Sequence, residues 1–198
     1  MDKNTVLYSA KDYSGLPGKT GFSDTLLNNH FKLYQGYVKN VNILLEKLRG
    51  LSAAGKDRDP EYAELKRRLG WEFNGMRLHE YYFDNLGGKT VLDAKDILYK
   101  KISENFENFD AWKQDFISSG VMRGIGWVVL CLDPQNGRLM NLWINEHDTG
   151  HIAGSKPVLV MDVFEHAYLT DFQIDRAGYI DVFFNNINWP EVSKRLKT

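Results

Sequence analysis

Two long stretches of helical periodicity dominate the first half of the chain and constrain its fold more than any other feature. Ser23 and Asp24 offer an N-cap and a first-turn acid, and Gly50 offers a stop. Between them, side chains of one face recur every three or four residues, which predicts a helix of about 27 residues and about 40 Å. This first stripe comprises Leu27, His30, Tyr34, Tyr37, Val41, Leu44 and Leu48.

A second stripe follows after a short polar turn. Asp59-Pro60 is typical of a helix start, and Gly87-Gly88 is typical of a helix end. Two long helices joined by a short turn pack antiparallel, so we expect a helical hairpin as an N-terminal domain over residues 1–90. The second stripe comprises Tyr62, Leu65, Leu69, Phe73, Met76, His79, Phe83 and Leu86.

The second half of the chain contains strand patterns. Apolar runs at 127–132 and 139–144 flank Asp133-Pro-Gln-Asn-Gly137, which is turn chemistry typical of a β-hairpin. A third apolar run, at 157–163, suits the centre of a small sheet. We therefore predict a three-stranded antiparallel sheet with the third run in the middle.

Helical spacing lies on both sides of these strands. Residues 94–118 have it, with a break near 105–110, and residues 167–198 return to it, with interruptions near Gly178 and Pro190. Helices, then strands, then helices predict the α+β class. We expect a C-terminal domain over residues 91–198 in which helices accompany the sheet.

Composition excludes several classes of function. The chain has 25 basic and 26 acidic side chains and a formal charge of −1, so it has no general attraction for nucleic acid or for anionic membranes. Cys131 is the single cysteine, which excludes an intrachain disulfide and a cysteine-based metal site. The first residues form no apolar segment, and no run approaches 18 apolar residues, so we expect a soluble, cytoplasmic protein.

The histidines are the most informative polar residues. His30 and His79 lie on the apolar stripes of the two long helices, facing the neighbouring helix. Asp162 ends the third apolar run, where a buried carboxylate needs a partner or a metal, and His166 follows four residues later. Three imidazoles and one carboxylate suit iron, manganese or zinc. The remaining two histidines, His147 and His151, are expected in a polar loop, with an adventitious metal as the alternative.

One block of sequence resembles a known family. Asp162-Val-Phe-Glu-His-Ala-Tyr168 is similar to the D-V-W-E-H-A-Y signature of iron/manganese superoxide dismutases, with Phe164 in place of Trp. The resemblance implies a dismutase whose substrate is superoxide, with one Fe or Mn ion per subunit held by His30, His79, Asp162 and His166. Val160 favours iron. Other family motifs occur in the same order, namely Phe73-Asn-Gly75, Asn85-Leu86, Phe109-Asp-Ala-Trp112, Gly124-Ile-Gly-Trp127 and Asn188-Trp189.

The resemblance also implies roles around the ligands. Tyr37 matches the family's gateway Tyr, Tyr34 stands for the histidine that precedes it, and Trp127 lies near the metal. Glu165 and Tyr168 are expected at a two-fold interface of a homodimer, which can assemble further into a tetramer.

The Gln that tunes the family's metal through a hydrogen bond to bound solvent is absent from both of its expected places. Arg123 stands at one of them and Gly75 at the other. We therefore predict that Arg123 faces the metal in place of the Gln; its alternative is an ion pair with Glu80 or Glu165.

Two other functions remain open at this point. One is a metal-binding protein of the same fold with little dismutase turnover, because Arg123 replaces the tuning Gln. The other is a non-haem iron oxygenase or peroxidase that uses two histidines and a carboxylate, which needs two open metal positions and an organic-substrate pocket. The four predicted ligands and the gateway Tyr favour the dismutase.

Overall fold

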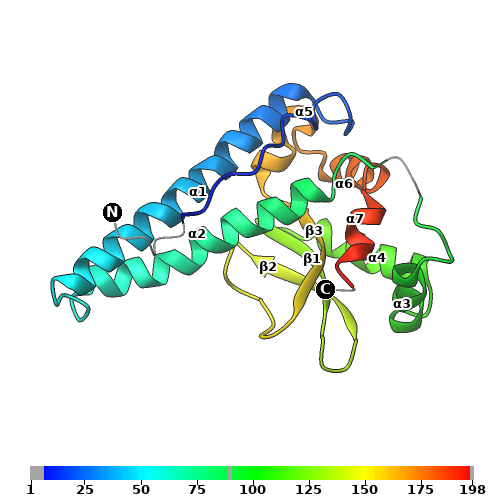
Figure 1. The fold of residues 1–198 in the computed structure, drawn as a ribbon. Coiled ribbons are helices and arrows are strands. Elements are labelled where there is room, and N and C mark those ends of the chain that lie inside the picture. The colour runs from blue at the N-terminus through cyan, green and yellow to red at the C-terminus, as the bar shows by residue number, and fades with distance from the viewer. Residues whose placement is uncertain (1–6, 89–90, 197–198) are drawn as a thin grey trace.

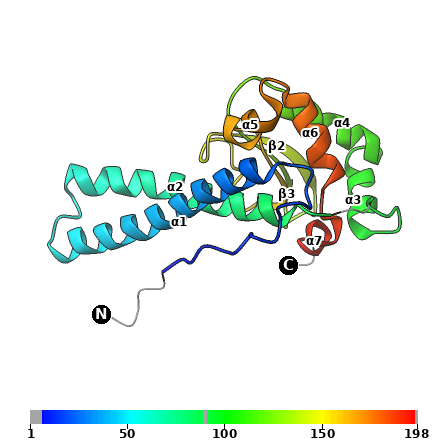
Figure 2. The ribbon, with the colours of Figure 1, turned by 90° about the horizontal axis from the view of Figure 1, so that it is seen from above.

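The computed structural model describes residues 7–88 and 91–196, and its first half is the predicted helical hairpin (Figures 1 and 2). α1 (Asp24–Ala53) begins where Ser23 Oγ accepts a hydrogen bond from the backbone N–H of Leu26 at 3.1 Å. α2 (Pro60–Asp84) begins with its proline in the first turn, where no N–H is needed. α1 continues past Gly50, its predicted end, because an interior glycine weakens a helix without breaking it.

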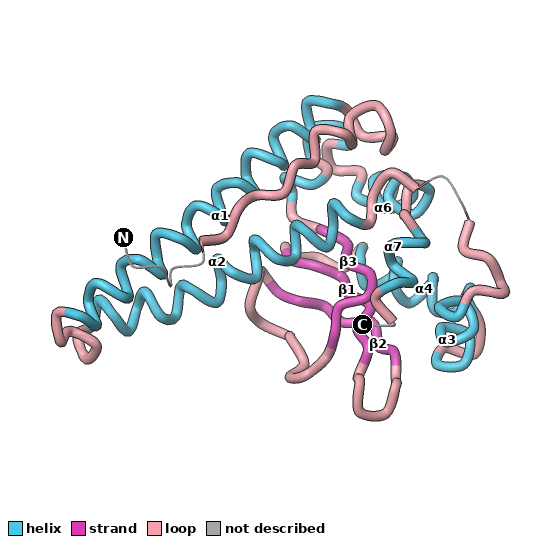
Figure 3. Tube along the Cα trace, in the orientation of Figure 1, coloured by secondary structure: helices cyan, strands magenta, loops and turns pink. Residues whose placement is uncertain are grey.

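The sheet has three antiparallel strands, as predicted, but in a different order. β1 (Gly126–Leu132) pairs with β2 (Leu139–Asn145) on one side and with β3 (Lys156–Asp162) on the other (Figure 3). The prediction that the 157–163 run lies at the centre is therefore wrong. Residues 159–162 of β3 are fully buried because α2 packs against this edge strand, which gives it the apolar character of a central strand.

The remaining helices surround the sheet at the end of the hairpin (Figure 1). The expected break near 105–110 separates α3 (Ile97–Asn105) from α4 (Phe109–Gly120). Three helices and a short 3-10 turn, η1, complete the chain, and none of the helices in the described ranges is long and apolar enough to cross a membrane. These elements are η1 (Glu165–Ala167), α5 (Leu169–Phe172), α6 (Arg176–Asn185) and α7 (Trp189–Lys194).

Gly178 and Pro190, predicted as interruptions, lie in the first turns of α6 and α7. The Gly178 N–H donates to the capping carboxylate of Asp175 at 2.9 Å, and Pro190 needs no N–H acceptor at its position. The interruptions fall instead between the helices, at 173–175 and 186–188. Both residues therefore mark helix starts.

Buried hydrogen bonds fix the end of β3 against its neighbours. Asn85 Nδ2 at the end of α2 donates to Val160 O at 2.6 Å, and Asn85 Oδ1 accepts from Arg195 at 2.6 Å. The Tyr179 hydroxyl of α6 donates to Asp162 O at 2.6 Å. The last residue of the sheet is thereby held beside the inner face of the hairpin.

Candidate metal centre

Four side chains from four elements meet between the hairpin and the sheet. His30 lies in α1, His79 in α2, Asp162 at the end of β3 and His166 in η1. One atom from each lies within 4.8 Å of the others. Asp162 Oδ2 is 3.1 Å from His30 Nε2, 3.1 Å from His166 Nε2 and 3.6 Å from His79 Nε2. His166 is the most accessible, with 27% of its side chain exposed, whereas the other three side chains are fully buried.

The protonation of His79 follows from its neighbour. Its Nδ1 lies 2.6 Å from Gly75 O, and because a carbonyl only accepts, Nδ1 carries the ring proton. The Nε2 atom of His79 therefore offers a lone pair. Among the described residues, His79 Nε2 and His30 Nδ1 are buried ring nitrogens without a hydrogen-bond partner. An unpartnered basic nitrogen that faces a carboxylate and two imidazoles is what a metal ion needs.

The charges of the cluster suit a cation. Burial lowers the pKa of His30 and of His79, so both imidazoles are held neutral. Burial alone would raise the pKa of Asp162, but electrostatic attraction to and hydrogen bonding with the nearby imidazoles of His166 and His30 hold it far below its usual range. The cluster therefore provides an anionic oxygen of Asp162 together with the neutral nitrogen donors of His30 and His79, a set that binds first-row transition metals.

A buried hydrogen-bonded chain lies beside the cluster. Trp127 Nε1 donates to His147 Nδ1 at 3.0 Å, and His147 Nε2 lies 2.9 Å from the Tyr37 hydroxyl. An indole N–H only donates, so Nδ1 is the acceptor and the proton of neutral His147 is on Nε2. Tyr37 therefore accepts from His147, and its own proton remains available for another acceptor. The Tyr37 ring lies 5.1 Å from that of His79.

His147 lies in the turn after β2, as predicted, but its side chain is fully buried. Burial lowers its pKa to about 4. The signal that finds it is the register of the β-hairpin, which pairs Trp127 with Ile144 and so brings the residues after β2 beside the start of β1. His151 does lie exposed, with its ring nitrogen 2.9 Å from His147 O.

The structure does not bring Arg123 to the cluster. Arg123 is exposed and lines a surface hollow of about 350 Å³ together with Glu165 and Tyr168. Glu80, one of its two predicted partners, is paired with Arg77 at 2.5 Å. A solvated guanidinium at the surface cannot take the place predicted for it beside a buried metal.

Tyr34 is buried, but its hydroxyl is already bonded to other groups. It accepts from the backbone N–H of Lys11 at 2.9 Å and donates to Glu80 Oε1 at 3.0 Å. Its ring centroid is 6.4 Å from that of His79. Tyr34 therefore joins the N-terminal segment to α2, whereas the hydroxyl of Tyr37 is part of the chain beside the cluster.

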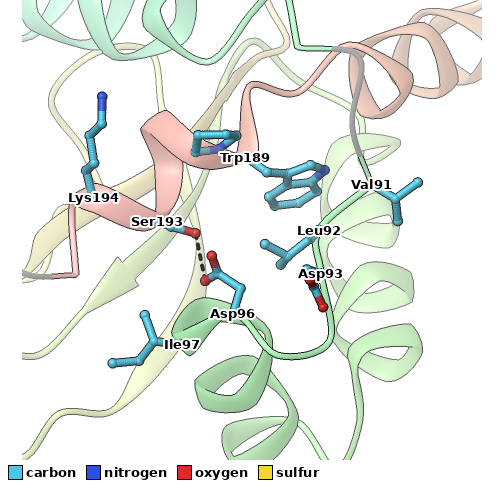
Figure 4. A pocket seen from close by; sticks show the side chains of 9 residues that line it. Val91, Leu92, Asp93, Asp96, Ile97, Trp189, Ser193 and Lys194 are labelled. Carbon is cyan, nitrogen blue, oxygen red and sulfur yellow. Dashed lines mark hydrogen bonds between the residues drawn. The ribbon is translucent and has the colours of Figure 1, made fainter.

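A separate hollow of about 500 Å³ lies between the start of α3 and α7 (Figure 4). Asp96 accepts there from Ser193 Oγ at 2.9 Å and from the Leu98 N–H at 2.7 Å. Its carboxylate is thus used within the fold, and the hollow shares no residue with the four-residue cluster.

Comparison with known proteins agrees with this geometry. Residues 94–195 match the family described as iron/manganese superoxide dismutases, C-terminal domain. The chain is 36% identical to superoxide dismutase [Fe] of Cupriavidus metallidurans, covering 96% of each, and 35% identical to superoxide dismutase [Fe] of Aquifex pyrophilus, covering 94% of this chain and 90% of the relative. It is also 30% identical to superoxide dismutase [Mn] 2 of Haloferax volcanii, covering 84% of this chain and 82% of the relative. The chain belongs to the iron/manganese superoxide dismutase family.

Proposed function

We propose that the protein disproportionates superoxide at one iron ion held by His30, His79, Asp162 and His166. The observation that carries the proposal is the convergence of three imidazole nitrogens on one carboxylate oxygen in a buried site, where the His79 nitrogen has no hydrogen-bond partner within residues 7–88 and 91–196. Two superoxide anions and two protons give one dioxygen and one hydrogen peroxide, and the bound ion supplies the one-electron exchange between them. Zinc is unsuitable because it has no redox chemistry.

The residues of the site set its charge. Asp162 contributes one negative charge, and the neutral imidazoles of His30 and His79 contribute none, so a site that holds a divalent or trivalent ion stays positive and attracts an anionic substrate. The buried surroundings strengthen this attraction, because few water molecules screen it. Burial also raises the pKa of Tyr37, which keeps its proton at neutral pH and can donate a hydrogen bond.

His147 takes the tuning role that the sequence assigned to Arg123. Its Nε2–H holds the oxygen of Tyr37, and its Nδ1 is held by Trp127, so the orientation of the Tyr37 hydroxyl depends on it. The alternative function, a metal-binding protein with little dismutase turnover, was based on the absence of a side chain that could replace the tuning Gln. With His147 in this role, that alternative has no remaining support.

Iron is favoured over manganese by the names of the relatives. Those of Cupriavidus metallidurans and Aquifex pyrophilus are named as iron enzymes, and Val160 points the same way, although the relative of Haloferax volcanii is named as a manganese enzyme. The test is the metal content of the purified protein, followed by superoxide consumption by forms reloaded with iron, manganese or zinc. Activity of the iron form alone supports the proposal. An iron-loaded protein that consumes no superoxide refutes it, and activity confined to the manganese form refutes the choice of iron.

The working unit is a homodimer. Glu165 and Tyr168 line the hollow that also contains Arg123, and the partly exposed ligand His166 follows Glu165 directly. The same hollow has several exposed apolar side chains, and a cluster of exposed apolar side chains is typical of a protein interface. Those that line the hollow are Val121, Met122, Ile125 and Ile174. Sedimentation separates a dimer from a tetramer, and a stable metal-loaded monomer contradicts both.

The division into domains over 1–90 and 91–198 and a cytoplasmic location remain part of this proposal. The first is supported by the packing of α1 against α2 in the hairpin and by the C-terminal family match at 94–195. Limited proteolysis near residue 90 tests it.

A further inference from the structure

Trp71 of α2 packs against the outer side of His147. The two ring centroids are 4.4 Å apart at an interplanar angle of 66°, the shortest ring separation among the described residues. Trp71 also contacts the Tyr37 ring at 5.7 Å. The ring centroid of Phe164 lies 4.8 Å from that of His147, at an interplanar angle of 30°. The rings of Trp71 and Phe164 therefore both pack against the imidazole. His147 is thus enclosed by rings from α2 and from the segment after β3.

Two charged residues hold the indole of Trp71. Its Nε1–H donates to Glu146 Oε2 at 3.0 Å, and the guanidinium of Arg68 lies 3.6 Å from its ring centroid. Arg68 is itself paired with the buried carboxylate of Glu72 at 2.8 Å. We call Trp71, Glu146 and Arg68 the Trp71 clamp.

The backbone joins the clamp directly to His147. Glu146 precedes His147 and has a left-handed backbone, with φ of 50°, which a residue other than glycine adopts only where its surroundings enforce it. The turn is closed by hydrogen bonds between Asn145 and Thr149 in both directions, at 2.7 and 3.3 Å. One side chain of this turn reaches out to α2, and the next one enters the core.

We propose that the Trp71 clamp positions the imidazole of His147, so that Nε2 stays directed at Tyr37 while Nδ1 stays directed at Trp127. Rotation of the ring by half a turn about Cβ–Cγ would place Cε1 where Nε2 now faces Tyr37 and Cδ2 where Nδ1 now faces Trp127, so both hydrogen bonds would be lost. The close packing of Trp71 and Phe164 against the imidazole prevents this rotation. The hydrogen bond from Trp71 to Glu146 holds the indole in that position. The effect of this positioning on dismutase activity rests on the proposed function. The orientation of the His147 ring does not, because it can be measured in the metal-free protein.

The experiment records side-chain ¹H–¹⁵N correlation spectra of the histidines in the metal-free protein, labelled with ¹⁵N. His147 is expected to show a single tautomer protonated on Nε2, with slow exchange of that proton. Glu146→Ala and Trp71→Phe each remove the same hydrogen bond, and each should speed the exchange about tenfold, as expected for loss of a bond to a charged acceptor. The double variant should add nothing, because both changes remove one interaction.

Matched variants make the result specific. Glu146→Gln keeps an acceptor oxygen for Trp71 and should restore slow exchange. Lys66→Ala removes another exposed cation of α2 that lies over a ring, that of Tyr62, and should change nothing at His147.

Unchanged His147 signals in the folded Glu146→Ala variant overturn the proposal, as do equal effects of Glu146→Ala and Glu146→Gln. Glu146 is exposed, so its variants can be read even where Trp71→Phe does not fold. The spectra are independent of dismutase activity. Failure of the proposed function would appear only in the superoxide assay.

Discussion

Gly75→Ala tests how closely the two long helices must approach beside the metal cluster. A Cβ at Gly75 would lie 2.7 and 2.8 Å from two carbons of the Tyr37 ring, whereas non-bonded carbons settle at about 3.5–4.0 Å. The ring must therefore move by about 1 Å. Its hydroxyl lies 2.9 Å from His147 Nε2, so a shift of that size breaks the hydrogen bond between them.

The magnitude follows from three opposing contributions. Overpacking costs about 1–3 kcal/mol, and loss of the hydrogen bond costs about 1 kcal/mol. Replacing glycine with alanine within a helix contributes about 1 kcal/mol of stability in the other direction. We expect Gly75→Ala to lower the free energy of unfolding by about 2 kcal/mol.

Gly70→Ala provides the matched control. It lies in the same helix, and its Cβ meets nothing within 4 Å, so only the helical contribution remains and stability should rise by about 1 kcal/mol. Urea denaturation of the metal-free proteins measures both variants. Equal stabilisation by the two substitutions would refute the packing argument. Metal content should not change in Gly75→Ala, because the backbone carbonyl that holds His79 remains.

Three further predictions concern the ligands, the acid range and the assembly. Asp162→Asn should lower the metal content by more than about tenfold because it removes the only anionic ligand, whereas Asp148→Asn, in the exposed loop, should not; retention of metal by Asp162→Asn contradicts the ligand set. The pKa of His147 is lowered to about 4 in the folded state, so the folded protein resists protonation of this side chain. Protonation of His147 therefore does not lower the free energy of unfolding above about pH 6.5, and it lowers this free energy by about 3 kcal/mol as the pH falls to 4. His147→Gln should reduce this decline in urea titrations of the metal-free protein, and an identical pH dependence in the two proteins refutes the assignment. Glu165→Ala should weaken the dimer and metal retention together in sedimentation and metal analysis, and an unchanged association constant counts against the interface.

The helices and the four clustered side chains were predictable because their signals are local. Helical periodicity repeats over many turns, and it places His30 and His79 on the inner faces without knowledge of the rest of the fold. Asp162 and His166 were marked by a charge at the end of an apolar run. The order of the strands has no such local signal. β3 is an edge strand that α2 buries, and its own sequence pattern cannot distinguish burial by a helix from burial between two strands.

His147 was missed for a related reason. Its neighbours Asn145, Glu146, Asp148 and Thr149 are exposed, and a loop of that composition predicts exposure throughout. Its burial depends on Trp71 and Tyr37, which lie 76 and 110 residues away in the chain. Arg123 was misplaced because a position in a motif does not fix whether a side chain faces the core or the solvent.

The direction of the hydrogen bonds beside the cluster limits which residues can occupy position 147. Trp127 can only donate, so the residue at 147 must accept from it and then donate to Tyr37 if the tyrosine proton is to remain available. A neutral histidine does this through its two nitrogens, and a glutamine can do it through its oxygen and its amide. A carboxylate accepts at both oxygens and would take the tyrosine proton into its own hydrogen bond. The indole of Trp127 thus sets the direction of the whole chain, although its Nε1 has no contact with Tyr37 other than through His147.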